Sequence, residues 1–428
     1  MKAYKAMTRE ELEELKKELE KVYEDVKGKG LSLNMARGKP STEQLDLTKD
    51  MLDVLDSKAD LFTEDGIDTR NYGELTGIRE AKVLIADLME VDPDEVIVFG
   101  NGSLSIMYDT VAGSMSFGVN GMTPWNKLEK VKFLCPVPGY DRHFAITERF
   151  GIEMINIPLT EDGPDMDMVR DYVENDEAVK GIWCVPKYSN PTGTTYSDET
   201  VRAFAALKPK ADDFRIYWDN AYAVHDLYED DKDVLLNIMD ECKKQGREDM
   251  VYQFVSTSKI TFAGAGIAAV ISSKANLEWY RQNMTIRTIG YDKVNQLRHV
   301  RYFKNADGIR NKMKDHARIL APKFKAVLDC FEKELDGLEI GTYTRPKGGY
   351  FISFMALEGC AGKIVAKCKE AGMVTTGAGA TYPYKKDPKD SNIRIAPSYP
   401  TLEDMKEAAS LFCLCVKLVS IEKVLEDK

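Results

Sequence analysis

The sequence has few of the residues from which metal centres and disulfide frameworks are built. Its 428 residues include only four histidines, and its eight cysteines are dispersed with no Cys-x-x-Cys pair. Zinc centres use clustered Cys and His ligands, so no metal site is expected. Several cysteines lie in apolar runs, where a reduced thiol behaves as a small hydrophobic residue. Because the N-terminus does not read as a secretory signal, we expect a cytoplasmic protein.

Long apolar runs and basic runs are also missing. No apolar stretch approaches the ~20 residues that span a bilayer, which excludes a membrane-embedded class of protein. The formal net charge is −11, and the 59 Lys and Arg residues do not gather into a run suited to phosphate backbones. Nucleic acid is therefore not expected as a partner. Anionic small molecules remain possible ligands, because a few buried arginines suffice to bind them.

The chain is long enough for two hydrophobic cores, and 43% of its residues are apolar. Short strand-like segments alternate with helix-like segments, which predicts an α/β fold with a mainly parallel sheet covered by helices on both faces. The strand-like segments are residues 96–99, 133–135, 153–157, 181–185, 215–218, 251–255 and 267–271.

The two ends of the chain are expected to form a second, smaller α+β domain. Residues 8–27 read as a helix that begins at Thr8, with Glu11 completing a capping box. A long helical stretch at about 295–335 is expected to cross between domains, followed by strands at 350–355 and 392–396. The predicted division is 1–48 and 311–428 for the small domain, and 49–310 for the large, ligand-binding domain.

The most informative motif is the segment Ser256-Thr257-Ser258-Lys259, which ends a strand-like run and precedes several small residues. Burial disfavours the ammonium form of a lysine and leaves a nucleophilic amine that can form an imine with a carbonyl compound. Alone, such a tetrapeptide is more often an ordinary surface feature.

Three other segments place polar side chains at or in strands. Asp219 ends the 215–218 strand, where open α/β sheets bind ligands, and its carboxylate can hold a heteroaromatic nitrogen protonated; the alternative is a turn or cap residue. Asn190 lies in an Asn-Pro-Thr-Gly turn after a strand, and its amide can donate to a ring oxygen. Arg394 lies inside an apolar strand, and its planar fork suits a carboxylate.

The order Asn-Pro-x-Gly, Asp-x-Ala-Tyr, Ser-x-Ser-Lys and a C-terminal strand arginine resembles the fold-type I pyridoxal-phosphate aminotransferases. The resemblance runs from about residue 30 to the end. Residues 35–40, 258–262 and 292–296 resemble a divergent bacterial branch of aspartate aminotransferases. This implies pyridoxal 5'-phosphate as cofactor, amino acids and 2-oxo acids as substrates, and a homodimer with shared active sites. The substrate pair implied is L-aspartate and 2-oxoglutarate.

The resemblance also implies a role for each matching residue. Lys259 forms the imine and moves the Cα proton, Asp219 keeps the ring nitrogen protonated, and Tyr222 donates to the phenolate oxygen. The other cofactor-binding residues implied are Gly102, Ser103 and Leu104 in the phosphate loop, Tyr140 against the ring, His143 beside Asp219, Asn190, Ser256, Ser258, and Tyr72 from the partner subunit. The substrate-binding residues implied are Arg394 for the α-carboxylate, with Asn190, Gly38 and Arg37.

Two points stay open at this stage. Eight residues after the lysine (259 + 8 = 267) the family usually has an arginine that pairs with the phosphate, and this chain has Ile267. The cation for a distal substrate carboxylate is also unassigned among Arg37, Arg142 and Arg287.

Other activities share the scaffold that the resemblance implies, since fold alone does not determine reaction. Aminotransfer from another amino acid, β-elimination and decarboxylation are the enzymatic alternatives. A regulator with a fused DNA-binding domain is disfavoured by the acidic chain and the short segment before residue 30. A non-enzymatic binding module would depend on neither the cofactor nor Lys259.

Overall fold

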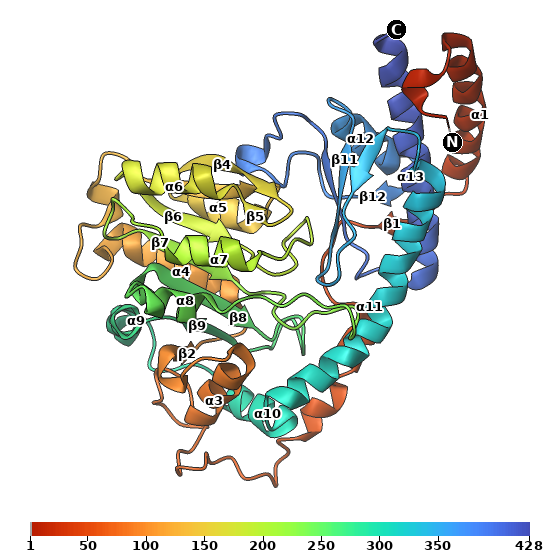
Figure 1. The fold of residues 1–428 in the computed structure, drawn as a ribbon. Helices are drawn as coiled ribbons and strands as arrows, with labels where there is room; N and C mark the ends of the chain where they lie inside the picture. The colour runs from red at the N-terminus through yellow and green to blue at the C-terminus, as the bar shows by residue number, and fades with distance from the viewer. Residues whose placement is uncertain (1) are drawn as a thin grey trace.

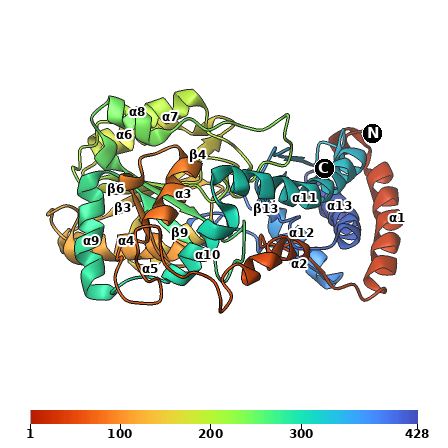
Figure 2. The same cartoon turned by 90° about the horizontal axis from the view of Figure 1, so that it is seen from below.

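The computed structural model describes residues 2–428 and divides the chain into two lobes (Figure 1). One lobe contains a large sheet covered by helices. The other contains both chain ends. The long helix α11 (Ala306–Leu335) runs from one lobe to the other, and helix α1 (Arg9–Lys27) lies on the outer side of the second lobe, away from the sheet (Figure 2).

The large sheet has eight strands in the order β2-β9-β8-β7-β6-β3-β4-β5. Each pair of neighbours from β8 to β4 is parallel. The pairs β2–β9, β9–β8 and β4–β5, at the two edges of the sheet, are antiparallel. This confirms the predicted α/β fold with a mainly parallel sheet. The strands are β2 (Val96–Val98), β3 (Lys132–Val137), β4 (Glu153–Thr160), β5 (Gly163–Pro164), β6 (Val179–Cys184), β7 (Arg215–Asp219), β8 (Val251–Ser256) and β9 (Ala268–Ile271).

Both faces of this sheet are buried, because side chains alternate between two apolar cores. On β7, Tyr217 belongs to one core and Trp218 to the other. Helices cover the two faces, and each is amphipathic or fully apolar where it meets the sheet. They are α3 (Arg79–Met89), α4 (Ser103–Phe117), α5 (Asp141–Arg149), α6 (Met166–Asn175), α7 (Asp198–Ala205), α8 (Ile238–Lys244), α9 (Lys274–Arg287) and α10 (Lys293–Phe303).

The second lobe joins the N-terminal segment to the C-terminal third of the chain around a third apolar core. Thr8 caps α1, and Glu11 completes the predicted capping box. The remaining elements are β1 (Leu33–Asn34), α2 (Thr42–Asp46), β10 (Gly341–Tyr343), β11 (Ile352–Ala356), α12 (Ala361–Glu370), β12 (Met373–Val374), β13 (Asn392–Ile395) and α13 (Leu402–Glu426). Strand β13 is antiparallel to β11, and β1 is parallel to β12.

The predicted helical stretch at 295–335 is interrupted in the structure. Helix α10 ends at Phe303, and Lys304 takes a left-handed conformation with φ +67°. Asn305 then caps α11 by accepting a hydrogen bond from the Gly308 N–H. The break is local, so amphipathic periodicity on both sides does not reveal it. Helix α11 contributes Ile309 to a core beside the sheet and Phe324 to the second lobe, and the predicted domain boundaries at 48 and 310 stay a prediction.

The eight cysteines are all free thiols, and seven of them are buried. Within residues 2–428, no helix combines the length and apolar character that crossing a membrane requires. Over the same residues, no group of three or more His, Cys, Asp or Glu side chains is arranged to hold a metal ion.

A buried ion pair near the starts of β6 and β7 gives a test of the packing. Lys180 Nζ lies 2.6 Å from Asp213 Oδ1, and both side chains are almost fully buried. The Trp125 indole donates to the other oxygen at 2.8 Å. Replacing Asp213 with Ala leaves a buried cation without its partner, which costs about 3–5 kcal/mol. We expect a clearly lower thermal midpoint by calorimetry, largely restored in a Lys180→Met, Asp213→Leu double variant. A midpoint within about one degree of wild type would contradict this interpretation of the pair.

Candidate active site

The candidate residues converge where the parallel strands end and the second lobe faces the sheet. Asp219 is the last residue of β7, and Ser256 is the last residue of β8. Asn190 follows β6, Tyr140 follows β3, and Arg394 comes from β13 in the other lobe. Ligands of open α/β sheets bind at this edge, because loops there diverge from the sheet.

Asp219 is a buried carboxylate with one oxygen bonded and one oxygen free. Its Oδ2 lies 3.0 Å from His143 Nε2, and the two side chains are only 4% and 1% exposed. The His143 ring stacks on Trp183, with centroids 4.5 Å apart. Asp219 Oδ1 has no hydrogen-bond partner among the described residues. Since an unpaired buried carboxylate oxygen is costly, this atom fits a ligand that presents a protonated nitrogen.

Lys259 is partly buried and its amine faces aromatic rings. Nζ lies 4.9 Å from the ring centroid of Tyr222 and 6.0 Å from that of Tyr350. Burial lowers the pKa of the Lys259 ammonium from its ordinary value, and the negative charge of Asp219 partly opposes this fall. The environment therefore shifts Lys259 towards the neutral, nucleophilic amine.

Residues from distant segments fix the backbone around Lys259. The Tyr350 hydroxyl donates to the Lys259 carbonyl oxygen at 3.5 Å, and Gln44 Nε2 donates to the Tyr350 hydroxyl at 3.0 Å. A ring nitrogen of His316 lies 3.0 Å from the carbonyl oxygen of Ile260. Sequence reasoning missed these three residues, because no local pattern around them signals a contact with the lysine.

The glycine-rich turn before α4 lies against the lysine segment. Gly102 caps α4 without a side-chain hydrogen bond, and Ser103 is the first helical residue. Ser258 Oγ donates to the carbonyl oxygen of Asn101 at 2.9 Å. The free N–H groups of this first turn, which includes Leu104, and the helix dipole suit a phosphate. Ile267, in contrast, is 1% exposed and belongs to a sheet core, so the position carries no cation.

Two phenols flank the same region. Tyr140 meets His143 edge-on, with ring centroids 4.9 Å apart. Burial, with a smaller effect of Asp219, raises the pKa of Tyr140 to about 12. Burial also raises the pKa of Tyr222 well above its ordinary value. Both hydroxyls are therefore protonated donors near neutral pH. Tyr140, His143 and Asn190 line one small hollow between the loops.

Arg394 brings the two lobes together. Its Nη1 donates to Asn190 Oδ1 at 3.2 Å and to Asp141 Oδ1 at 3.0 Å, both in the sheet lobe. Its Nε donates to Thr376 Oγ1 at 3.3 Å, and its guanidinium lies 4.8 Å from the Phe351 ring centroid. The sequence predicted a buried arginine in this strand, but its partners Asp141, Thr376 and Phe351 were missed.

Gly38 packs directly against the Phe351 ring. A Cβ at Gly38 would lie 2.0 Å from Cζ of Phe351, so the close approach requires glycine.

The three candidate cations for a distal carboxylate are Arg37, Arg142 and Arg287. Arg37 and Arg142 are exposed and form no ion pair within residues 2–428, and Arg287 pairs with Asp109. None of them hydrogen-bonds a candidate cofactor-binding residue of its own chain.

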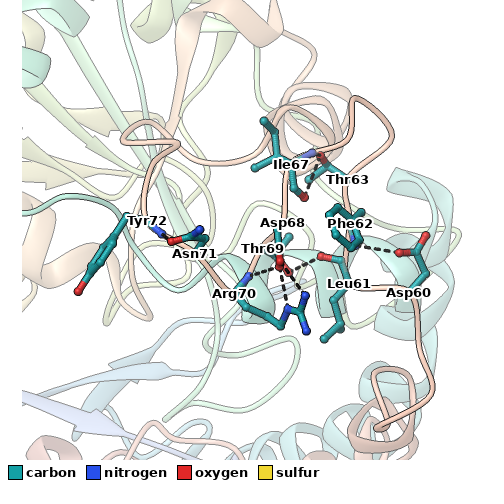
Figure 3. A network of polar contacts seen from close by, with 10 residues as sticks. All are labelled: Asp60, Leu61, Phe62, Thr63, Ile67, Asp68, Thr69, Arg70, Asn71 and Tyr72. Atoms are coloured by element: carbon teal, nitrogen blue, oxygen red, sulfur yellow. Dashed lines mark hydrogen bonds and ion pairs between the residues drawn. The ribbon is translucent and has the colours of Figure 1, made fainter.

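Tyr72 lies on the surface, 80% exposed, at the end of a loop held by its own polar contacts. Arg70 Nη2 pairs with Asp68 Oδ2 at 2.7 Å, and Thr69 Oγ1 donates to the Leu61 carbonyl at 2.7 Å. Figure 3 shows the Tyr72 side chain projecting away from this network. The structure does not bring Tyr72 to the other candidate residues of the same chain.

The donor set fits pyridoxal phosphate. Asp219 Oδ1 suits its ring nitrogen, the start of α4 suits its phosphate, and the Lys259 amine suits its aldehyde. A larger cavity of about 950 Å³ lies elsewhere, between α11, the end of α3 and the loop after β7. None of the candidate residues predicted from the sequence lines that cavity, so it is distinct from the site.

Known proteins resemble this chain over nearly its whole length. Residues 7–428 match the family described as aspartate amino-transferase. The aspartate aminotransferase of Corynebacterium glutamicum is 45% identical over 406 residues, which cover 95% of this chain and 93% of that protein. A solved aspartate transaminase from Corynebacterium glutamicum superposes with a TM-score of 0.96 at 43% identity, over 99% of both chains.

More distant structures share the fold. An α-aminoadipate aminotransferase from Thermus thermophilus, complexed with N-(5'-phosphopyridoxyl)-L-leucine, has a TM-score of 0.73 at 18% identity, over 91% of this chain and 92% of that one. At this identity the similarity concerns architecture alone.

The contact at Gly38 gives the first functional prediction. A methyl group in Gly38→Ala must displace the Phe351 ring, and with it the support under Arg394. Overpacking of this kind costs roughly 1–3 kcal/mol, so we expect KM for amino-acid substrates to rise about 5- to 150-fold. Gly377→Ala is the matched control, because a Cβ there meets no atom within 4 Å. Equal KM values for the two variants would show that the stack does not support substrate binding.

Proposed function

Because the chain belongs to the aspartate amino-transferase family and is therefore an aminotransferase, we propose that it transfers the amino group of L-aspartate to 2-oxoglutarate. The cofactor is pyridoxal 5'-phosphate, and the products are oxaloacetate and L-glutamate. The observation that carries the proposal is the buried Asp219 carboxylate, which is bonded to His143 through one oxygen and unpartnered at the other. Its charge also acts on the amine of Lys259.

Lys259 and Asp219 divide the proton chemistry in this proposal. When bound, the cofactor supplies an electron sink for the electron pair left at Cα. Lys259 Nζ would take and return the proton at Cα, which requires the neutral amine that burial favours. Asp219 would stabilise a proton on the ring nitrogen by charge attraction, and His143 holds Asp219 in place. Tyr222 and Asn190 would hold the ring oxygen by hydrogen bonds.

Arg394 orients the substrate. Its planar guanidinium donates two parallel hydrogen bonds to the α-carboxylate, so Cα is held at a fixed distance from Lys259. Phe351 supports one face of the guanidinium, and Gly38 packs against the Phe351 ring. A four-carbon dicarboxylate needs a second cation, for which Arg37, Arg142 and Arg287 are the candidates.

A homodimer completes the proposed site. Tyr72 and the nearby Ile289 are large side chains that are 80% and 63% exposed. Gly290 packs on the carbonyl of Gly73, so both lie on one stretch of surface. A second copy that covers this surface would receive Tyr72 at its cofactor phosphate.

We also place the protein in the cytoplasm, where its eight free thiols stay reduced.

Replacing the lysine tests the reaction. Lys259→Ala should lower transamination by several orders of magnitude, because no other amine replaces Nζ. Lys259→Arg should not restore activity, since a guanidinium stays protonated. Intact-mass measurement after borohydride reduction should show covalently attached cofactor in wild type and none in either variant. Normal turnover by Lys259→Ala would overturn the proposed function.

The distal carboxylate gives a separate test of substrate choice. Among Arg37→Ala, Arg142→Ala and Arg287→Ala, at least one should lose kcat/KM for aspartate selectively over alanine. Breaking a desolvated charge pair costs on the order of 2–5 kcal/mol, or about thirty- to several-thousand-fold. Arg281→Ala, which removes an exposed arginine of α9 paired with Glu278, is the control. If the ratio of kcat/KM for aspartate to kcat/KM for alanine is the same in all three variants as in the control, the distal cation lies elsewhere. If wild type itself shows no preference for aspartate, the proposed substrate is wrong.

A further inference from the structure

The guanidinium that is proposed to hold the substrate already holds a carboxylate of its own chain. Arg394 Nη1 lies 3.0 Å from Asp141 Oδ1, and the side chains are 9% and 36% exposed. The same nitrogen donates to Asn190 Oδ1 at 3.2 Å, which leaves neither of its two hydrogens free. Asp141 is therefore a counter-ion of Arg394 within its own chain.

Asp141 occupies this place because of its position in the fold. It is the first residue of α5, directly after Tyr140, and the helix N-terminus favours a negative charge there. It belongs to the sheet lobe, whereas Arg394 belongs to β13 of the other lobe. The ion pair thus spans the gap between the lobes at the edge of the candidate site.

An incoming α-carboxylate competes with Asp141 for the same charge. A bidentate carboxylate needs two neighbouring N–H groups of the guanidinium, and the edge formed by Nη1 and Nη2 includes the nitrogen that Asp141 occupies. The other edge includes Nε, which donates to Thr376. Binding at that edge would still set two carboxylates on one cation, where their repulsion opposes binding. One guanidinium charge neutralises only one carboxylate.

We propose that Asp141 is an internal counter-ion that the substrate carboxylate displaces from Arg394, and that it thereby sets the affinity of the site for carboxylate ligands. The inference rests on the proposed role of Arg394 as the partner of the α-carboxylate. Displacement costs part of the binding free energy of every carboxylate. Because the cost is the same for each carboxylate, it lowers the affinity for all of them by the same factor. Asp141 in this sense sets the affinity of the site and does not take part in proton transfer.

The test measures binding of succinate, an unreactive dicarboxylate, to the cofactor-loaded enzyme by titration calorimetry. Asp141→Asn keeps the size and the hydrogen-bonding capacity of the side chain and removes its charge. Removal of this half-buried competing charge should make the binding free energy of succinate more favourable by about 0.7–1.4 kcal/mol. Its Kd should therefore fall roughly 3- to 10-fold. KM for aspartate should fall in parallel, while kcat does not rise. An unchanged or larger Kd for succinate would overturn the proposal.

Two further variants separate this effect from others. Asp198→Asn removes a carboxylate from the first position of α7, where it pairs with Arg202 at 3.1 Å, and so controls for net charge and helix-terminal effects. Its Kd for succinate should equal that of wild type. If Asp141→Asn folds poorly, Asp141→Ser replaces it, with the cofactor absorbance and thermal midpoint as checks on folding.

Arg394→Ala distinguishes failure of this inference from failure of the proposed function. If Arg394→Ala abolishes succinate binding while Asp141→Asn leaves it unchanged, Arg394 is the carboxylate partner and Asp141 does not compete. If Arg394→Ala binds succinate as well as wild type, Arg394 is not the carboxylate partner, and the role of Asp141 fails with it. The proposal stands only if removal of Arg394 weakens binding and removal of the Asp141 charge tightens it.

Discussion

A carboxylate that is held out of water needs cationic or hydrogen-bonding partners, and Asp219 is the carboxylate around which this site is arranged. It ends β7, which lies between the parallel strands β6 and β8, so neighbouring strands exclude solvent from both sides. His143 satisfies one oxygen, and Trp183 holds the His143 ring in place by stacking. The other oxygen is left for a ligand. The same negative charge acts on Lys259, so the acid and the amine are coupled through a shared, poorly solvated space.

Arg394 is one of the residues that connect the second lobe to this arrangement. Thr376 and Phe351 hold the guanidinium from within its own lobe, while Asn190 and Asp141 reach it from the sheet lobe. A movement of one lobe against the other would change the contacts of Arg394 with Asn190 and Asp141 and leave its contacts with Thr376 and Phe351 intact. Helix α11 passes through both lobes. If Arg394 binds the substrate as proposed, substrate binding and the relative position of the lobes are linked.

Sequence reasoning predicted the sheet and the location of the site because both depend on local patterns. Polar residues such as Asp219 and Asn190 stand directly after apolar strands, and parallel strands bring their ends to one edge. The contacts of Arg394 with Asp141 and of Tyr350 with the Lys259 backbone were not predictable in this way. Asp141 and Arg394 are 253 residues apart, and Asp141 alone reads as an ordinary residue at a helix start. The break at Lys304 was missed because a single left-handed residue leaves the flanking periodicity unchanged.

The position of Ile267 shows how such non-local packing constrains the chemistry. Its N–H donates to Thr257 Oγ1 at 2.9 Å, and its side chain is buried among the apolar residues of one sheet core. A cation there would lie in that core without a partner, at a cost that no single hydrogen bond offsets. In the proposed site, a phosphate at the start of α4 would be held by N–H groups and by the helix dipole, which contributes about half a charge. Because these N–H donors carry no net charge, they hold a phosphate through well-aligned hydrogen bonds, and their positions therefore matter more than those of a charged side chain would. The hydrogen bond from Ser258 to Asn101 fixes the turn before α4 relative to the segment that carries Lys259.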